Sequence, residues 1–212
     1  MKSAIREPRS RNYATTRQAI IESALKSFAQ HGYAGATTEI IARHAGVTKR
    51  LIFYYFKTKS LLFTAVLEHS YAIMRTGELG LELDQLPPRQ AIRALVEWTF
   101  DFDFKHSHFV RVVMIENILL GRHMAKSVVL KEMAKKIIEQ LGGIVERGIA
   151  AGVFRKDLGP VELHAIISSL CFFAVENRYT FAAQFGYNMA SRKTHNKHKT
   201  LVVELVEKFL EG

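Results

Sequence analysis

Cysteine and proline are scarce in this sequence. Its 212 residues include one cysteine, Cys171, and four prolines. A single cysteine excludes a disulfide within the chain, which fits a protein of the reducing cytoplasm. Because prolines are few, long helices can continue without interruption. We find no convincing run of alternating apolar and polar residues that would predict a strand, so we expect an all-α protein.

Long apolar runs are absent as well. The longest candidate for a membrane-spanning run covers 163–175, which is 13 uncharged residues. A membrane-spanning helix needs about 20 apolar residues, so we expect this run to be a buried core helix and expect no membrane partner. The N-terminus has no apolar stretch of the kind found in secretory signals. Together these features favour a cytoplasmic location.

The motifs of common enzymes are missing too. There is no Gly-x-Ser-x-Gly elbow, no phosphate-binding glycine loop and no His-Glu-x-x-His. Two histidine pairs, His106 with His108 and His195 with His198, have poor spacing or lie in a lysine-rich stretch. We therefore expect no catalytic residue, no metal and no cofactor. A helical enzyme remains an alternative of low weight.

Two acids, Asp101 and Asp103, are further candidates for acid–base chemistry. Asp101 and Asp103 lie among phenylalanines, but no matching acid–base partner is near them in the sequence. We expect both to be exposed acids on an amphipathic helix.

Positive charge is what the sequence has in excess, and it is unevenly placed. The chain carries a formal net charge of +10. Residues 1–60 hold 11 basic and 3 acidic residues, whereas the remaining 152 hold 19 and 17. Such an asymmetry predicts a nucleic-acid partner for the N-terminal part.

Residues 42–59 indicate how that partner is bound. A helix is expected to end at Ala45, Gly46 can take a positive φ in a short turn, and Thr48 can cap the next helix with its hydroxyl. Two helices joined by a three-residue turn with glycine are typical of a helix-turn-helix. Basic and aromatic residues follow the turn, as a helix that enters a DNA groove requires. They are Lys49, Arg50, Phe53, Tyr54, Tyr55, Lys57 and Lys59.

Apolar periodicity predicts about nine helices in two domains. We expect a helix-turn-helix domain over 1–58, whose first 14 residues form a basic arm, and a second helical domain over 59–212. The arm either contacts DNA through Arg6, Arg9 and Arg11 or is a disordered tail. Besides the two helices around the turn, the expected helices cover 15–30, 59–77, 88–106, 109–120, 124–151, 161–185 and 201–210.

The segment from Thr38 to Leu62 resembles the DNA-binding domain of the tetracycline-repressor (TetR) family. The matching residues are Thr38, Ile41-Ala42, Ala45-Gly46-Val47-Thr48, Phe53-Tyr54-Tyr55-Phe56, Lys59 and Leu62. The resemblance covers about fifty residues, and the remaining chain is similar in length and helix count to the family's all-α second domain. The resemblance therefore implies that 59–212 is an effector-binding and dimerisation domain. Arg50 and Leu51 depart from the family pattern, which often has a small residue and a threonine there. These departures imply a different operator sequence.

The resemblance implies a DNA-binding surface. Phosphate contacts are expected from the hydroxyls of Thr38, Tyr54 and Tyr55 and from the ammonium of Lys59. Base contacts are expected from Lys49 and Arg50, which can both pair with guanine. Core packing is the alternative for Tyr54 and Tyr55, and Phe53 either packs or touches a thymine methyl. The expected set is Thr38, Thr48, Lys49, Arg50, Phe53, Tyr54, Tyr55 and Lys59.

The resemblance also implies a pocket for a small effector, aromatic or amphipathic, between the middle helices. Glu116 and Asn177 lie on otherwise apolar helix faces and need a partner. That partner is a ligand, another side chain or the second protomer of a dimer. Ordinary core is the alternative for each apolar candidate. The candidates are Trp98, Phe102, Phe109, Met114, Glu116, Phe172 and Asn177.

The expected function follows from these parts. A homodimer formed through the last two long helices would present two recognition helices to a palindromic operator in double-stranded DNA. We expect a transcriptional repressor that a small molecule releases from its operator. A nonspecific architectural DNA-binding protein is the main alternative.

Overall fold

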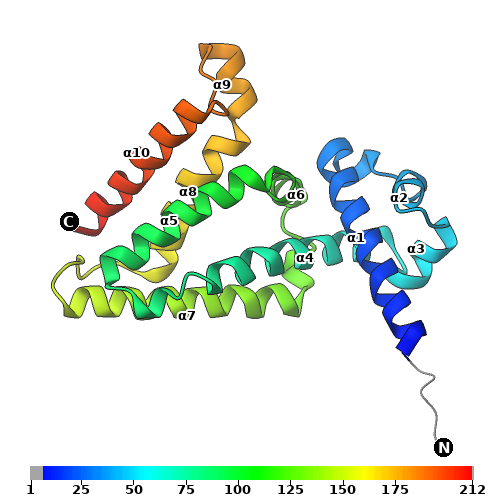
Figure 1. The fold of residues 1–212 in the computed structure, drawn as a ribbon, viewed down its shortest axis with the longest axis horizontal. Coiled ribbons are helices and arrows are strands. Elements are labelled where there is room, and N and C mark those ends of the chain that lie inside the picture. The colour runs from blue at the N-terminus through cyan, green and yellow to red at the C-terminus, as the bar shows by residue number, and fades with distance from the viewer. Residues whose placement is uncertain (1–6, 212) are drawn as a thin grey trace, which may run out of the picture. The chain divides into compact units, whose positions relative to one another are not determined.

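The computed structural model describes residues 7–211, with side chains from residue 13 onwards, and confirms the all-α prediction. These residues form ten α-helices and two short 3-10 helices, and no strand occurs among them. The elements are α1 (Glu7–Gly35), α2 (Thr38–His44), α3 (Lys49–Phe56), α4 (Lys59–Leu79), η1 (Leu83–Gln85), α5 (Pro88–Lys105), α6 (Ser107–Ile118), η2 (Met124–Lys126), α7 (Val128–Ala150), α8 (Pro160–Glu176), α9 (Arg178–Phe185) and α10 (Arg192–Glu211) (Figure 1).

Helix α1 is longer than expected at both ends. It begins at Glu7, so the segment 7–14 that we expected to be an arm is helical, while Arg6 and the other residues before Glu7 lie outside the described part. At the other end, Gly32 has φ 70° and ψ 176°, which kinks the helix before its last turn. Only glycine adopts this conformation without strain, so the expected stop at Gly32 is a kink.

The expected single helix over 161–185 is wrong, because the structure divides it at Asn177 into α8 and α9. Asn177 has φ −96° and ψ 3°, outside the helical region, and its backbone N–H donates to the carbonyl of Phe173. The apolar residues continue on both sides of the break. Hydrophobic periodicity therefore gave no indication of it.

Helix α10 begins at Arg192, earlier than the expected residue 201. Two side chains of its polar first half are tied to α5. His195 Nε2 lies 2.9 Å from Asp101 Oδ1, and Lys199 Nζ donates to Asp101 Oδ2 at 2.8 Å. These contacts hold a lysine-rich segment as helix that its composition alone predicted to be solvated.

The chain divides into two compact units. Unit 1 contains the described residues up to Ser70 together with Arg111–Ser127, and unit 2 contains Tyr71–Val110 and the residues from Val128 on. Two of the three divisions fall within helices, in α4 and in α6, and the third lies between Ser127 and Val128, where α7 begins. The domain boundary that we expected between residues 58 and 59 remains a prediction.

Unit 1 is built on α1, which packs against α2, while α2 packs against α3. The hydroxyl of Ser23 on α1, itself buried, donates to the carbonyl of Ile41 on α2 at 3.0 Å. This bond fixes α2 on α1 and thereby sets the direction of the turn that follows. The unit 1 core is made of fully buried apolar side chains, among them Ile20, Ile21, Ala24, Phe28, Ile41, Ile52, Leu62 and Phe63.

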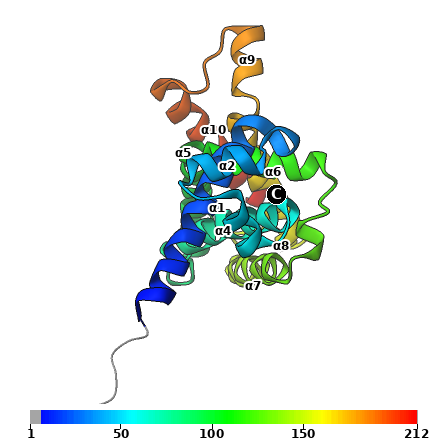
Figure 2. The same ribbon diagram turned by 90° about the vertical axis from the view of Figure 1, so that its right-hand side faces the viewer.

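Unit 2 is a helical body in which α5 packs against α7, α8 and α10 (Figure 1). The segment 163–175 lies in α8, and Leu163, Ile167 and Cys171 on it are buried in the unit 2 core, as expected for a core helix. Helix α9 stands out from this body beyond α8, as Figure 2 also shows. No helix in residues 7–211 combines the length and the hydropathy that crossing a membrane requires.

Candidate functional site

The helix-turn-helix has the predicted local geometry. Thr37 caps α2 by accepting from the N–H of Ile40, and Thr48 caps α3 by accepting from the N–H of Leu51, both at 3.3 Å. Gly46 in the turn has φ 66°, a conformation that favours glycine. A threonine hydroxyl at the N-cap satisfies one of the helix's first four N–H groups, so the sequence itself sets where each helix begins.

Helix α3 has one buried side and one exposed side. Ile52 and Phe56 are 1% and 5% exposed and anchor the helix in the unit 1 core. The opposite side carries Lys49, Arg50 and Tyr54, all exposed. Because α3 has only eight residues, this one-sided anchoring exposes both cations of the helix to solvent.

Lys49 is already paired in the free protein. Its ammonium donates to the carboxylate of Glu39 on α2, and it lies 5.9 Å from the ring centroid of Phe53. The hydrogen bond from Lys49 lowers the pKa of Glu39 to about 2. Arg50 beside it has no ion pair with any described residue. The two cations, for which we expected the same role, therefore differ, since only Arg50 is uncompensated. Sequence reasoning did not assign the Glu39 pairing.

Three tyrosines, two of them on α3 and one on α1, form a cluster. The ring of Tyr13 on α1 lies 4.5 Å from that of Tyr55 and 6.5 Å from that of Tyr54. Tyr54 is 62% exposed and Tyr13 45%, whereas Tyr55 is half-buried. Core packing is thus a partial description of Tyr55 and does not fit Tyr54. Tyr13 was missed from the sequence because it lies in a segment expected to be an arm.

The remaining expected DNA contacts are partly engaged within unit 1. Thr38 is buried and its hydroxyl donates to Glu39 Oε2 at 3.2 Å. The ammonium of Lys59 donates to the carbonyl of Ala34 at 3.2 Å and lies 5.0 Å from the Tyr33 ring centroid. Partial burial lowers the pKa of Lys59. A phosphate role for either residue stays a prediction.

The apolar candidates for the effector pocket lie in different places. Trp98, Phe102 and Phe109 come together in one aromatic cluster of unit 2, with centroid distances of 4.9 Å for Trp98 to Phe102 and 5.8 Å for Phe102 to Phe109. Met114 belongs to the unit 1 part of α6, and Phe172 is half-buried on α8.

The two polar candidates find partners within the chain. Glu116 is 1% exposed and its carboxylate accepts from the backbone N–H groups of His123 and Met124, at 2.7 and 2.9 Å, and contacts the His123 ring at 2.7 Å. The side-chain amide of Asn177 donates to the carbonyl of Phe173 at 3.4 Å. The sequence left open whether the partner of Glu116 is a ligand, another side chain or a second protomer. In the structure its partners are the His123 side chain and backbone N–H groups of the same unit.

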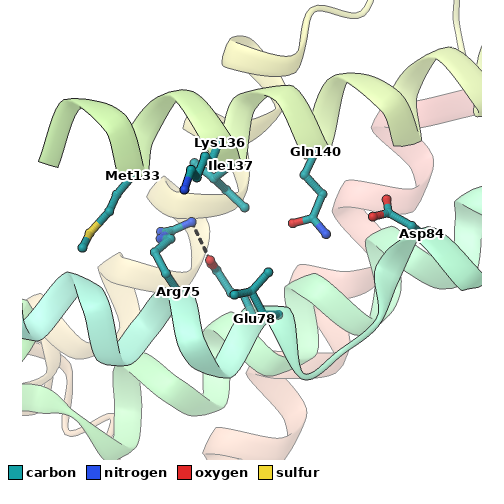
Figure 3. A pocket seen from close by; sticks show the side chains of 8 residues that line it. Arg75, Glu78, Asp84, Met133, Lys136, Ile137 and Gln140 are labelled. Carbon is teal, nitrogen blue, oxygen red and sulfur yellow. Dashed lines mark ion pairs between the residues drawn. The ribbon is translucent and has the colours of Figure 1, made fainter. Parts of the chain in front are cut away.

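Unit 2 contains a cavity of about 380 Å³ between α4 and α7. Figure 3 shows Arg75 and Glu78 from α4 opposite Met133, Lys136, Ile137 and Gln140 from α7. A smaller cavity of about 20 Å³ is also lined by Glu78 and otherwise mainly by apolar side chains. None of the seven candidates lines either of these two cavities within the described residues.

The acids of this region escaped sequence reasoning. Asp103 was expected to be exposed, but it is only 2% exposed, while its neighbour Asp101 is indeed exposed. Glu78 is 4% exposed. The sequence of this phenylalanine-rich helix does not indicate which of the two acids is buried. Burial depends on which residues of α4 lie opposite each acid.

Comparison with known proteins places both parts of the chain. Residues 20–66 match the family described as bacterial regulatory proteins, tetR family, and residues 88–206 match the family described as tetracyclin repressor-like, C-terminal domain. The HTH-type transcriptional repressor NicS of Pseudomonas putida is 35% identical over 190 residues, which is 90% of each chain.

Solved structures share the fold. The transcriptional regulator SCO4942 of Streptomyces coelicolor superposes with a TM-score of 0.69 at 22% identity, covering 92% of this chain and 98% of that one. AibR in complex with isovaleryl coenzyme A and operator DNA superposes with a TM-score of 0.68 at 15% identity, covering 90% and 97%.

Proposed function

We propose a specific function from an established premise, which is that the chain belongs to the tetR family of bacterial regulatory proteins. The protein is a ligand-responsive, sequence-specific DNA-binding regulator that represses transcription. The observation that carries this function is the exposed side of α3, where Arg50 is uncompensated and Lys49 and Tyr54 lie beside it. The similarity to the repressor NicS over 90% of the chain supports repression as opposed to activation.

In this function α3 enters the major groove of an operator. Arg50 reads a guanine edge directly, because it has no internal partner to give up. Lys49 exchanges its pairing with Glu39 for a base or phosphate contact. Tyr54 and Tyr13 donate their phenolic hydroxyls to backbone phosphates, and Thr38 and Lys59 hold the phosphates at the far side of the turn.

Binding to a palindromic operator requires a dimer, which forms through α8 and α10. Each of these helices keeps large apolar side chains exposed in the single chain: Val161 and Phe173 on α8 are 57% and 39% exposed, and Leu201 and Leu205 on α10 are 45% and 55% exposed. Covering them in a two-fold interface removes apolar surface from water. The two copies of α3 then lie about 34–36 Å apart, or a multiple of this, to meet successive turns of DNA.

Release from DNA proceeds through α4. This helix is continuous from Lys59, which follows the helix-turn-helix, to Leu79, and its last turns carry Arg75 and Glu78 of the 380 Å³ cavity. A small molecule in that cavity favours one position of the end of α4. The same helix transmits the change to α3, so effector binding lowers the affinity for the operator.

Selection of bound DNA from a random pool tests the proposal. The full chain is expected to enrich a palindrome whose half-sites lie about one or two helical turns apart. A random set of sequences, bound with a steep salt dependence, would instead support a nonspecific architectural protein. No salt-dependent binding to DNA would contradict both functions.

A further inference from the structure

Glu78 is buried without a complete set of partners. Its Oε2 lies 2.5 Å from Nη1 of Arg75, one turn earlier on α4, so the two charges attract each other. Neither of these atoms makes a hydrogen bond of acceptable geometry, although both are inaccessible. A buried carboxylate that lacks an aligned donor costs free energy, which a donor from a ligand would recover.

Asp103 on α5 adds a second buried acid to the same place. Its Oδ1 has no hydrogen-bond partner among the described residues. Burial and, to a smaller extent, the nearby negative charge of Glu78 together raise the pKa of Asp103 to about 7. Burial likewise raises the pKa of Glu78 to about 7, although Arg75 opposes the shift. One arginine therefore faces two acids, and once both acids are ionised the cluster lacks one positive charge.

The other charged and titratable groups nearby do not supply that charge. His164 on α8 lines the smaller cavity, and burial lowers its pKa, so its ring is neutral at pH 7. Lys136 and Asp84 are exposed at the edge of the larger cavity and are of opposite sign. The unmet requirement is thus a positive hydrogen-bond donor beside Glu78.

Glu78 lies in the wall of a cavity. It lines both the 380 Å³ cavity and the smaller one, so its side chain lies between the two. Figure 3 shows it directed into the space between α4 and α7. The surrounding walls are largely apolar and suit an apolar body of modest size. They are formed by Leu79, Met133 and Ile137 in the larger cavity and by Met74, Leu95, Leu141 and Ile167 in the smaller one.

We propose that this cavity takes a small organic cation, an amine, amidine or protonated nitrogen heterocycle with an apolar body, whose N–H groups donate to Glu78. Asp103, when ionised, acts behind it by adding negative potential. A small anion held by Arg75 is disfavoured, because Glu78 already neutralises that arginine and an anion would be a third negative charge in a buried cluster. The inference rests on the proposed function only in assigning the effector to unit 2.

Three probes of nearly equal shape test the charge preference: benzamidine, which is cationic, benzamide, which is neutral, and benzoate, which is anionic. Trp98 is the only tryptophan and reports binding by its fluorescence. It packs so closely on Gly77, the residue before Glu78, that a Cβ there would lie 2.4 Å from the Trp98 ring. Benzamidine is expected to bind about tenfold to a hundredfold more tightly than the other two, as charge-assisted hydrogen bonds imply.

Two variants assign the preference to the cluster. Glu78→Gln should remove the advantage of benzamidine over benzamide, and Asp103→Asn should reduce it by a smaller factor. Glu139→Gln, which changes an exposed acid of α7 outside the cavity lining, should leave it unchanged. Thermal unfolding shows whether each variant is folded, and if Glu78→Gln is not, Asp103→Asn decides.

Each remaining outcome overturns the inference. Tighter binding of benzoate would assign the cavity to an anion at Arg75, and equal binding of all three or no binding would exclude a charge-selecting site. Binding of the full chain to its selected operator is measured separately. Intact operator binding with failed benzamidine binding therefore rejects the ligand class and leaves the DNA-binding function standing.

Discussion

Replacing Asp103 by asparagine should make the protein more stable at neutral and alkaline pH. Burial raises the pKa of this carboxyl from 3.8 to about 7, so the folded state keeps a proton that the unfolded state has released. The free energy of unfolding therefore falls as pH rises from about 4 to about 7, by about 1.4 kcal/mol per pH unit for one such group. Over that range the loss is about 4 kcal/mol.

The groups around Asp103 decide how much of this loss is observed. Glu78 on α4 has its own pKa raised to about 7 and is paired with Arg75. Asp101 on α5 is exposed. Cys171 on α8 has its thiol pKa raised by burial and by Asp103, and so stays neutral. Asparagine removes one of two coupled acids, so Glu78 ionises more readily in the variant. We expect a gain of about 2–4 kcal/mol at pH 8 and almost none at pH 4.

Urea unfolding at pH 4, 5, 6, 7 and 8 provides the measurement, at one protein concentration because a dimer's stability depends on it. The unfolding free energy of the variant should exceed that of the parent by an amount that grows from about pH 4 to about pH 7 and then levels off by pH 8. Glu97→Gln, on the same helix but only half-buried, serves as the control and should show no such trend. Equal pH dependence in the parent and in Asp103→Asn would refute the buried acid pair.

Three further outcomes are expected in the DNA-binding unit. Arg50→Ala should weaken operator binding by about 1–3 kcal/mol and relax sequence preference at one position, measured by anisotropy on matched and mismatched operators; unchanged preference would rule out base reading by Arg50. Thr48→Ala should lower stability by about 1 kcal/mol through loss of the cap on α3, whereas Thr48→Ser should keep most of it; equal melting of both variants would show that the hydroxyl contributes nothing. Glu39→Gln should release Lys49 and strengthen DNA binding several-fold at low salt, with the gain shrinking as salt is added, and unchanged affinity at low salt would mean that the Glu39 pairing does not compete with DNA.

The sequence was informative where local chemistry determines structure. The cap by Thr48, the turn at Gly46 and the start of α5 at Pro88 each depend on one residue and its neighbours, and all appear where the sequence predicted them. The exposed and buried sides of α3 follow in the same way from a 3.6-residue period.

Features that depend on distant segments were not predictable. Helix α10 starts early because Asp101 on α5 binds two of its side chains, His195 and Lys199. The buried acids Glu78 and Asp103 are 25 positions apart and come together only when α4 packs beside α5. A composition or a helical period carries no information on such pairs, so the aromatic candidates chosen for the pocket do not line the two cavities.

The distance between the two copies of the recognition helix in the DNA-bound dimer tests the central claim most directly. A spin label can be placed with His44→Cys at the exposed end of α2, since Cys171 is fully buried and stays unlabelled. Pulsed dipolar spectroscopy on the complex with the selected operator should give one narrow distance near 34–36 Å, or a whole multiple of it, within the reach of the label. An absent dipolar coupling, or a distance near half a turn more or less, would contradict two α3 helices reading one face of the same duplex.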